Sequence, residues 1–362
     1  MIFVKLLWAL LGLVVGSACA PSTSPATATA TATAALSLPQ AVKLNGQIFG
    51  SEWKVTIIAR DGATLSQARA QSVVIAATLA EVGRQLSLWE PQSELSRFNR
   101  AAWTEAVAVS PGLSALISTC LDIGQKTDGA FDVTLGPVLD VWGFSASTKG
   151  KVSAPPSAAA LAAARARTGL SLLHVAGGGI QKDREDMVID LTAVGDGAGA
   201  AAVMAALRER GFADVLVDVA GEVVVAGHGL KGPWQIGVNV PTADAAPDAV
   251  ERVVSLQADS GLRALSTSGT YREGFSSEGQ LYPHILDPQT GAPVTHNLLS
   301  CTVVADDVIV ADALSTACVA LGEKRSRAML ERFLGAEALF LSAQADHTIE
   351  ASMTKGFPNP SR

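Results

Sequence analysis

Apolar positions with a period of three to four residues predict two amphipathic helices in the first third of the chain. One face of the first helix carries Ile75, Leu79, Val82 and Leu86. The second helix begins at Ser110-Pro111, a capping residue followed by a proline suited to the first helical turn. Its apolar face carries Leu113, Leu116, Ile117, Cys120 and Leu121. Both faces require cover from other parts of a folded core.

Elsewhere, helical segments are mixed with short apolar runs that are typical of strands. We expect helices over residues 157–167, 196–210, 308–321 and 323–333. We expect strands over residues 47–59, 171–175, 187–191, 215–219, 222–226, 234–240, 252–257, 282–286, 300–304 and 338–341. Because the elements do not alternate in a regular βαβ rhythm, we favour an α+β body of two intimately packed mixed α/β lobes over a doubly wound parallel sheet.

The amino terminus has the pattern of an export signal. Residues 1–18 carry one basic side chain, Lys5, then an apolar stretch and three small residues. Cys19 follows directly, so residues 16–19 resemble the box in which the cysteine of a bacterial lipoprotein is lipidated after cleavage. The alternative is ordinary cleavage near Ala18, which would give a soluble secreted protein. Residues 20–35 contain only Ala, Thr, Ser and Pro, and such a flexible tether favours a lipid anchor at Cys19 on the periplasmic side of a bacterial membrane.

The predicted organisation is a signal peptide (1–18), a lipidated cysteine with its tether (19–38), a folded domain (39–350) and a C-terminal tail (351–362). Of the 362 residues, 48% are hydrophobic and 17% are charged, which excludes a wholly disordered chain. The net charge is -7 and no run of Lys or Arg occurs, which argues against a nucleic-acid partner. No C-x-x-C spacing is present, and we expect Cys120 and Cys318 to be buried helix residues.

A first candidate site lies in the predicted helix over residues 308–321. Asp312 and Thr316 are four positions apart, which places a carboxylate and a hydroxyl about one turn apart on one face. Two such oxygens can enter the coordination sphere of a hard cation such as Mg²⁺, whose other positions go to water and phosphate oxygens. The alternative is that Asp312 is an ordinary polar residue and that Thr316 hydrogen-bonds to a backbone carbonyl.

A second candidate site lies where the apolar segment ending in Asp190 meets a glycine-rich turn at residues 191–197. Glycine allows the backbone to approach a ligand, and the amides at a helix N-terminus attract phosphate. Tight packing of a helix on a strand also selects small residues and is the alternative. The absence of G-x-G-x-x-G and of a P-loop lysine argues against the standard dinucleotide and nucleoside triphosphate folds.

His284 is a candidate proton acceptor near neutral pH, and Asp287 could orient its ring. The alternatives are a structural histidine and a turn at Asp287-Pro288. The other four histidines show no metal-ligand spacing. The chain also lacks the G-x-S-x-G elbow of serine hydrolases.

These segments occur in one order with two further motifs, Leu88-Trp89-Glu90-Pro91 and Asp128-Gly129-Ala130-Phe131-Asp132. Together they resemble the ApbE family of flavin transferases over residues 44–341. Members of this family are periplasmic, are often lipid-anchored, and use Mg²⁺ to transfer FMN from FAD to a threonine hydroxyl of an acceptor protein with release of AMP. The resemblance implies an ApbE-like fold with the FAD site between its lobes. It also implies that the acceptor is a partner protein, for example a subunit of a membrane redox complex.

Residue by residue, the resemblance implies that Asp312, Thr316 and the backbone carbonyl of Ala193 bind the metal. It gives His284 the role of catalytic residue. The FAD site would be lined by Phe49, Trp89, Ala130, Phe131, Asp132, Asp190, Asp196, Leu286 and Ser315.

Three of these positions differ from the residues that are common in the family. Phe49 stands where Met is usual, and Trp89 stands where an aromatic residue, commonly Tyr, is found; both keep an apolar surface for a flavin. Asp196 stands where Lys or Glu is found. The sequence also leaves two other activities open. One is a Mg²⁺-dependent FAD pyrophosphatase, in which water replaces the acceptor hydroxyl, and the other is a flavin-binding lipoprotein without catalysis.

Overall fold

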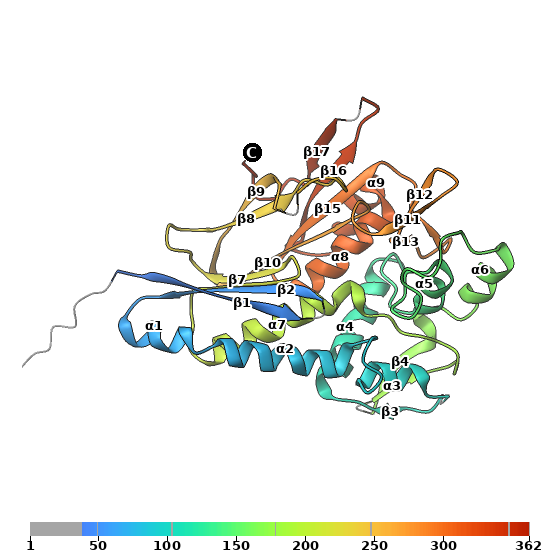
Figure 1. Cartoon of the computed structure of the whole chain (residues 1–362), viewed down its shortest axis with the longest axis horizontal. Helices are drawn as coiled ribbons and strands as arrows, with labels where there is room; N and C mark the ends of the chain where they lie inside the picture. Colours follow the sequence, from blue (N-terminus) through green and yellow to red (C-terminus); the bar gives the residue numbers. More distant parts are fainter. Residues whose placement is uncertain are drawn as a thin grey trace, which may run out of the picture. The chain divides into compact units, whose positions relative to one another are not determined.

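A large antiparallel sheet organises the fold (Figure 1). The computed structural model describes residues 38–48, 50–102, 104–177, 179–246, 248–346 and 348–361. Within these residues the sheet has eight strands in the order β1-β2-β6-β7-β10-β15-β16-β17, and each pair of neighbours is antiparallel. The expectation of an α+β fold without a doubly wound parallel sheet is therefore confirmed.

The strands of the large sheet are β1 Gln40–Ile48, β2 Ser51–Ala59, β6 Val215–Val219, β7 Glu222–Gly227, β10 Ala258–Gly269, β15 Leu298–Ala305, β16 Glu337–Ala343 and β17 Ile349–Met353. The smaller sheets are formed by β3 Val107–Ala108, β4 Leu173–Ala176, β5 Gly179–Lys182, β8 Trp234–Asn239, β9 Val250–Leu256, β11 Gly274–Ser277, β12 Gln280–Pro283, β13 Leu286–Asp287 and β14 Ala292–Pro293. The helices are α1 Gly62–Arg69, α2 Ser72–Leu86, α3 Glu94–Arg100, α4 Pro111–Lys126, α5 Gly136–Trp142, α6 Ala158–Arg165, α7 Thr192–Glu209, α8 Val308–Leu321 and α9 Glu323–Leu330.

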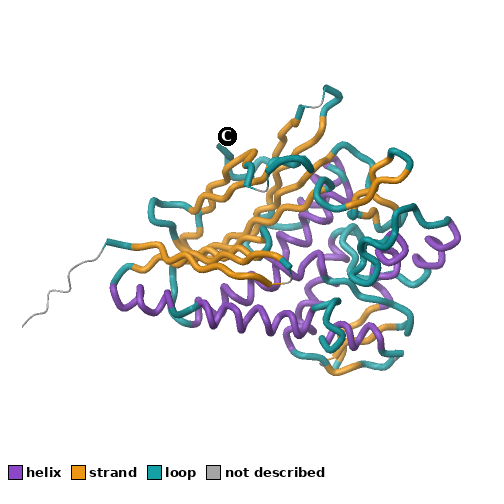
Figure 2. Tube along the Cα trace, in the orientation of Figure 1, coloured by secondary structure: helices purple, strands orange, loops and turns teal. Residues whose placement is uncertain are grey.

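Helices cover one face of the large sheet, and the hairpin β8–β9 packs on the other (Figure 2). Side chains alternate between the two faces of a strand. In β7, Val224 belongs to the core on the helical side, whereas Val223 and Val225 belong to the core on the hairpin side. The central strands are therefore buried on both faces, which explains why residues 223–226 of β7 are all apolar.

Several predicted elements are confirmed at or near their expected bounds. Helix α8 and strand β6 have the predicted bounds, and Ser110 caps α4 by accepting a hydrogen bond from the amide of Leu113 at 3.3 Å. The predicted strand over residues 47–59 is instead the hairpin β1–β2. Helix α7 begins at Thr192, four positions before its predicted start.

The predicted strand over residues 187–191 is wrong. This segment is largely buried, but it joins no strand ladder. The Asn99 side chain takes the place of a neighbouring strand, because it donates to the Ile189 carbonyl at 2.8 Å and accepts from the Ile189 amide at 2.9 Å. The Asp190 amide donates to the Val133 carbonyl at 2.8 Å. An apolar segment can thus satisfy its backbone without a sheet.

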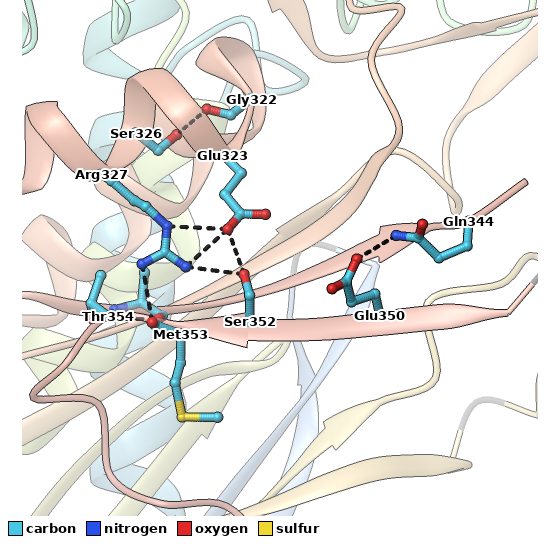
Figure 3. A network of polar contacts seen from close by, with 10 residues as sticks. Gly322, Glu323, Ser326, Arg327, Gln344, Glu350, Ser352, Met353 and Thr354 are labelled. Carbon is cyan, nitrogen blue, oxygen red and sulfur yellow. Dashed lines mark hydrogen bonds and ion pairs between the residues drawn. The ribbon is translucent and has the colours of Figure 1, made fainter.

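The folded domain extends beyond its predicted end at residue 350. Strand β17 continues to Met353, and Phe357 is buried in the core under the hairpin β8–β9. Arg327 of α9 fixes β17 by donating to the Met353 carbonyl at 3.0 Å and to the Ser352 hydroxyl at 3.1 Å (Figure 3). Residues 351–357 are therefore part of the fold and not a tail.

Residues 37–362 cluster as one compact unit. No helix among the described residues is long and apolar enough to cross a membrane. The predicted signal peptide, Cys19 and nearly all of the tether lie outside the described residues, as does Phe49.

Candidate active site

A cavity of about 510 Å³ collects most of the residues singled out from the sequence. Its volume lies in the range of small-molecule sites. The wall is built by the end of α2, the segment after α4, the start of α7, the end of β10, the segment around β13 and one side of α8. The predicted residues that line it are Trp89, Ala130, Phe131, Asp132, Asp190, Ala193, Asp196, His284, Leu286, Asp312 and Thr316. Residues as far apart in the sequence as Trp89 and Thr316 thus meet at one site.

Helix α8 delivers Asp312 and Thr316 to the cavity. The helix starts at a cap made by Asp307, whose carboxylate accepts from the amide of Ile309 at 2.7 Å. Asp312 is only 6% exposed, and its Oδ2 accepts from the amide of Gly197 at 3.1 Å. In a regular helix this amide would bond to the carbonyl of Ala193, so the bond to Asp312 brings the carboxylate next to the first turns of α7.

Position 197 has to be glycine for this contact to form. A Cβ atom there would lie 2.7 Å from Asp312 Oδ2 and 3.1 Å from its Cβ. The glycine-rich turn noticed in the sequence therefore serves a close approach between α7 and the Asp312 carboxylate. The sequence left two explanations for this turn, a ligand site and tight packing. Both apply, because the packing of α7 against Asp312 also positions a carboxylate in the cavity.

The start of α7 provides an anion-attracting helix end. Asp190 Oδ1 accepts from the amide of Thr192 at 2.9 Å and from its hydroxyl at 2.5 Å. Asp132 makes the same turn with Thr134, at 2.7 and 2.6 Å. Burial raises the pKa of both carboxyls, and the hydrogen bonds from the threonines oppose this shift. The two Asp-x-Thr turns fix the backbone at residues 132–134 and 190–192, and both segments line the cavity.

Three carboxyl groups face one another next to α8. Burial raises the pKa of Asp196 to about 6. The pKa of Asp312 is raised well above its usual range, by burial first and then by the charges of Glu222 and Asp196. Burial also raises the pKa of Glu222, and its Oε2 has no hydrogen-bond partner among the described residues. Ionising all three groups together is therefore unfavourable unless a positive charge compensates them.

Glu222 was not among the predicted site residues. It opens β7 directly after a turn in which Ala220 has φ 56° and Gly221 has φ 104°. The signal available in the sequence is a carboxylate that follows the turn residue Gly221 and opens an apolar strand. In the described part of the chain no group of three His, Cys, Asp or Glu side chains is arranged as metal ligands, so a cation here would also need hydroxyl, carbonyl or substrate oxygens.

His284 is oriented by Glu273 and not by Asp287, so that part of the prediction is wrong. Its Nδ1 lies 3.2 Å from the backbone carbonyl of Glu273. A carbonyl only accepts, so Nδ1 carries the proton and Nε2 presents its lone pair. Asp287 instead accepts from the amide of Gln289 at 2.8 Å. Burial lowers the pKa of His284, while the nearby Glu273 carboxylate raises it by a smaller amount.

An aromatic cluster supports the strand that leads to His284. The rings of Phe275 and Tyr282 in the hairpin β11–β12 are 5.2 Å apart, and the ring of Trp142 lies 5.7 Å from Tyr282. The Trp142 indole donates to the Gly291 carbonyl at 2.7 Å. Trp142 at the end of α5 therefore joins this helix to the segments on both sides of His284.

The remaining predicted residues differ in exposure. Trp89 is 63% exposed at the cavity wall, whereas Phe131 is 2% exposed beneath it. Ser315 is fully buried, does not line the cavity and hydrogen-bonds to Ser268 at 2.7 Å. Its predicted place in the wall of an FAD site does not match this position. Cys120 and Cys318 are fully buried helix residues, as expected.

Comparison with known proteins identifies one family. The sequence pattern of the ApbE family matches residues 49–340. The chain is 36% identical over 292 residues to the FAD:protein FMN transferase of Klebsiella pneumoniae, covering 79% of this chain and 80% of the relative. It is 32% identical over 293 residues to the enzyme of the same name from Vibrio cholerae, covering 81% and 85%.

Solved structures agree with these sequence relatives. The flavin transferase ApbE from Vibrio cholerae superposes with a TM-score of 0.75 at 29% identity, covering 88% of this chain and 98% of that one. The apo form of the flavinyl transferase ApbE from Pseudomonas stutzeri gives a TM-score of 0.74 at 30% identity, covering 88% and 95%.

The contact between Gly197 and Asp312 predicts opposite effects for two glycine substitutions in α7. Gly197→Ala should lower the free energy of unfolding by about 1–3 kcal/mol, because its methyl group collides with Asp312. Gly195→Ala meets nothing within 4 Å and should raise it by up to about 1 kcal/mol through helix propensity. Urea unfolding followed by circular dichroism measures both. Equal stabilisation by the two substitutions would contradict the described contact.

Proposed function

The chain belongs to the ApbE family, and from this membership we propose that it transfers FMN from FAD to a threonine hydroxyl of an acceptor protein and releases AMP. The observation that carries the proposal is the cavity in which the family's motifs meet, because Asp312, Thr316 and His284 all line it. The helix end at α7 suits a pyrophosphate in the same cavity. An exposed Trp89 offers a surface on which the flavin ring can stack.

We propose that Asp312, Thr316 and the Ala193 carbonyl bind Mg²⁺. The residues fit this ion, because all three donors are oxygens and one is a carboxylate. Gly197 leaves room for Asp312 beside α7, and a bound cation would favour the ionised form of Asp312, which burial and the neighbouring Glu222 and Asp196 disfavour. When bound, Mg²⁺ neutralises the charge that develops on the phosphate oxygens.

The protein's own groups then have separate tasks. The amides at the start of α7 attract the pyrophosphate, and the buried Phe131 and Leu286 form an apolar wall. Nε2 of His284 accepts the proton of the acceptor threonine. The threonine oxygen forms a bond to the FMN phosphorus, the bond from that phosphorus to the AMP oxygen breaks, and AMP leaves.

We also propose that Cys19 anchors the mature protein to the periplasmic face of a membrane. The support is the small-residue box before Cys19 and the Ala/Thr/Pro tether after it. Such an anchor would hold the enzyme near an acceptor in the same membrane.

The metal role predicts that Asp312→Ala abolishes Mg²⁺-dependent transfer. The purified protein is incubated with FAD, Mg²⁺ and a candidate acceptor domain, and flavin fluorescence is read on the denatured acceptor band. The expected loss for Asp312→Ala is at least about 100-fold, whereas Asp244→Ala, at an exposed loop position, keeps full transfer. Full labelling by Asp312→Ala at limiting Mg²⁺ would refute the role. Free FMN without labelled acceptor would identify a pyrophosphatase, and unchanged FAD a binding protein.

The position of His284 predicts the pH dependence of transfer. Burial lowers its pKa below 6.5, the Glu273 carboxylate raises it less, and the Lys149 ammonium lowers it slightly. The neutral base should therefore persist below pH 6.5, and kcat/KM should fall only as the pH drops through the lowered pKa. His284→Ala should reduce transfer by about 10²- to 10⁴-fold. A native rate in this variant, or an acidic limb centred above pH 6.5, would exclude His284 as the base.

The anchor predicts that Cys19→Ala moves the protein from the membrane to the soluble fraction of a bacterium that processes lipoproteins. Mass spectrometry of the mature wild-type protein should find a lipid on its N-terminal cysteine. Identical fractionation of the two proteins, or an unmodified Cys19, would favour ordinary cleavage near Ala18.

A further inference from the structure

A chain of hydroxyl groups connects Thr316 to the interior of the protein. The Thr316 hydroxyl lies 3.0 Å from Ser268 Oγ, which in turn lies 2.7 Å from Ser315 Oγ. Ser315 Oγ donates to the backbone carbonyl of Asp312 at 2.9 Å. Ser266 Oγ is also 3.1 Å from Ser315 Oγ. Ser266 also hydrogen-bonds to the carboxyl groups of Glu222 and Asp312, so its proton is not needed for the three contacts that link Thr316, Ser268, Ser315 and the Asp312 carbonyl.

The directions of these hydrogen bonds follow from counting protons. A carbonyl cannot donate, so the Ser315 proton must point at the Asp312 carbonyl. The contact between Ser268 and Ser315 then requires the Ser268 proton. The contact between Thr316 and Ser268 consequently requires the Thr316 proton. One arrangement satisfies these three contacts, and in it Ser268 accepts from Thr316.

The direction matters because a hydroxyl can bind a cation only through its lone pairs. We infer that Ser268 is a positioning residue that orients the Thr316 hydroxyl. This inference rests on the metal role proposed above. By accepting the proton of Thr316, Ser268 leaves the lone pairs of that oxygen for the cation. Asp312 and Thr316 line the same cavity wall as Ser268, so all three groups act at one place. Partners of this kind, which orient a metal ligand, commonly change metal affinity by 10- to 100-fold.

The backbone that carries Ser268 is rigid. Ser268 lies one residue before the end of β10, where it is in register with Cys301 of β15. The next residue is Gly269, where a Cβ would lie 2.4 Å from the Tyr271 ring and 2.8 Å from the Leu299 carbonyl. The strand and this tight turn hold Ser268 Oγ in position beside Thr316 of α8.

Without the Ser268 hydroxyl, the Thr316 proton has two other directions. It can turn to the carbonyl of Asp312, four residues earlier in the helix, as threonines in helices often do. It can also point into the cavity, where it opposes a cation. The first rotation turns the lone pairs of Thr316 away from the direction that Ser268 sets, and the second puts the proton where the cation would bind, so either weakens Thr316 as a ligand while the helix stays in place.

The test compares three variants. Ser268→Ala removes the acceptor, and Ser268→Thr retains a hydroxyl at that position. Ser300→Ala is the matched control, because Ser300 is a buried serine in the neighbouring strand β15 whose hydroxyl has no hydrogen-bond partner in the described structure. The direct readout is Mn²⁺ binding, followed by electron paramagnetic resonance with and without FAD. The second readout is the Mg²⁺ concentration that gives half-maximal transfer.

For Ser268→Ala we expect the dissociation constant of Mn²⁺ and the half-maximal Mg²⁺ concentration to rise together by about 10-fold or more, with kcat at saturating Mg²⁺ nearly unchanged. Ser268→Thr should recover most of the affinity, and Ser300→Ala should match the wild type. Unchanged Mn²⁺ binding by Ser268→Ala would overturn the inference, as would equal weakening in Ser300→Ala. A wild-type protein that neither binds Mn²⁺ nor responds to Mg²⁺ would instead refute the metal role itself.

Discussion

The buried Asp312 carboxylate is the constraint on which the rest of the site depends. It is only 6% exposed, and Glu222 and Asp196 add negative charge to its surroundings. Burying a charge is costly unless a partner compensates it. The cation proposed between this group and a pyrophosphate would provide that compensation, and it would let a carboxyl cluster and a doubly charged phosphate substrate share one cavity.

The fold supplies the rigidity that such a site needs. Helix α8 is almost entirely apolar and lies against β10 and β15, so its few polar side chains are fixed by the packing of the others. On one side Gly197 lets α7 approach the carboxylate. On the other side the Ser268 and Ser315 hydroxyls direct Thr316. The site is therefore organised before a ligand arrives, which is the condition for stabilising charge that develops during phosphoryl transfer.

The sequence predicted those parts of the molecule whose causes are local. The bounds of α8 and the cap of α4 follow from apolar periodicity and from a serine before a proline. Residues 187–191 were assigned to a strand because an apolar run does not reveal that the Asn99 side chain, about 90 positions away, satisfies the backbone.

Long-range contacts also explain which site residues the sequence did not reveal. Glu222 and Ser268 lie on strands far from α8 in sequence, and only the order of strands in the sheet brings them to it. His284 was recognised as a candidate base, but its orienting partner is a backbone carbonyl, which no side-chain motif records.

The most direct test of the account is a crystal structure of the protein with Mg²⁺ and an FAD analogue that cannot be cleaved. The account predicts one cation about 2.1 Å from an Asp312 oxygen and from Thr316 Oγ1, in contact with the pyrophosphate. A cation bound elsewhere, or a pyrophosphate that lies in the cavity while both side chains point away from it, would contradict the account.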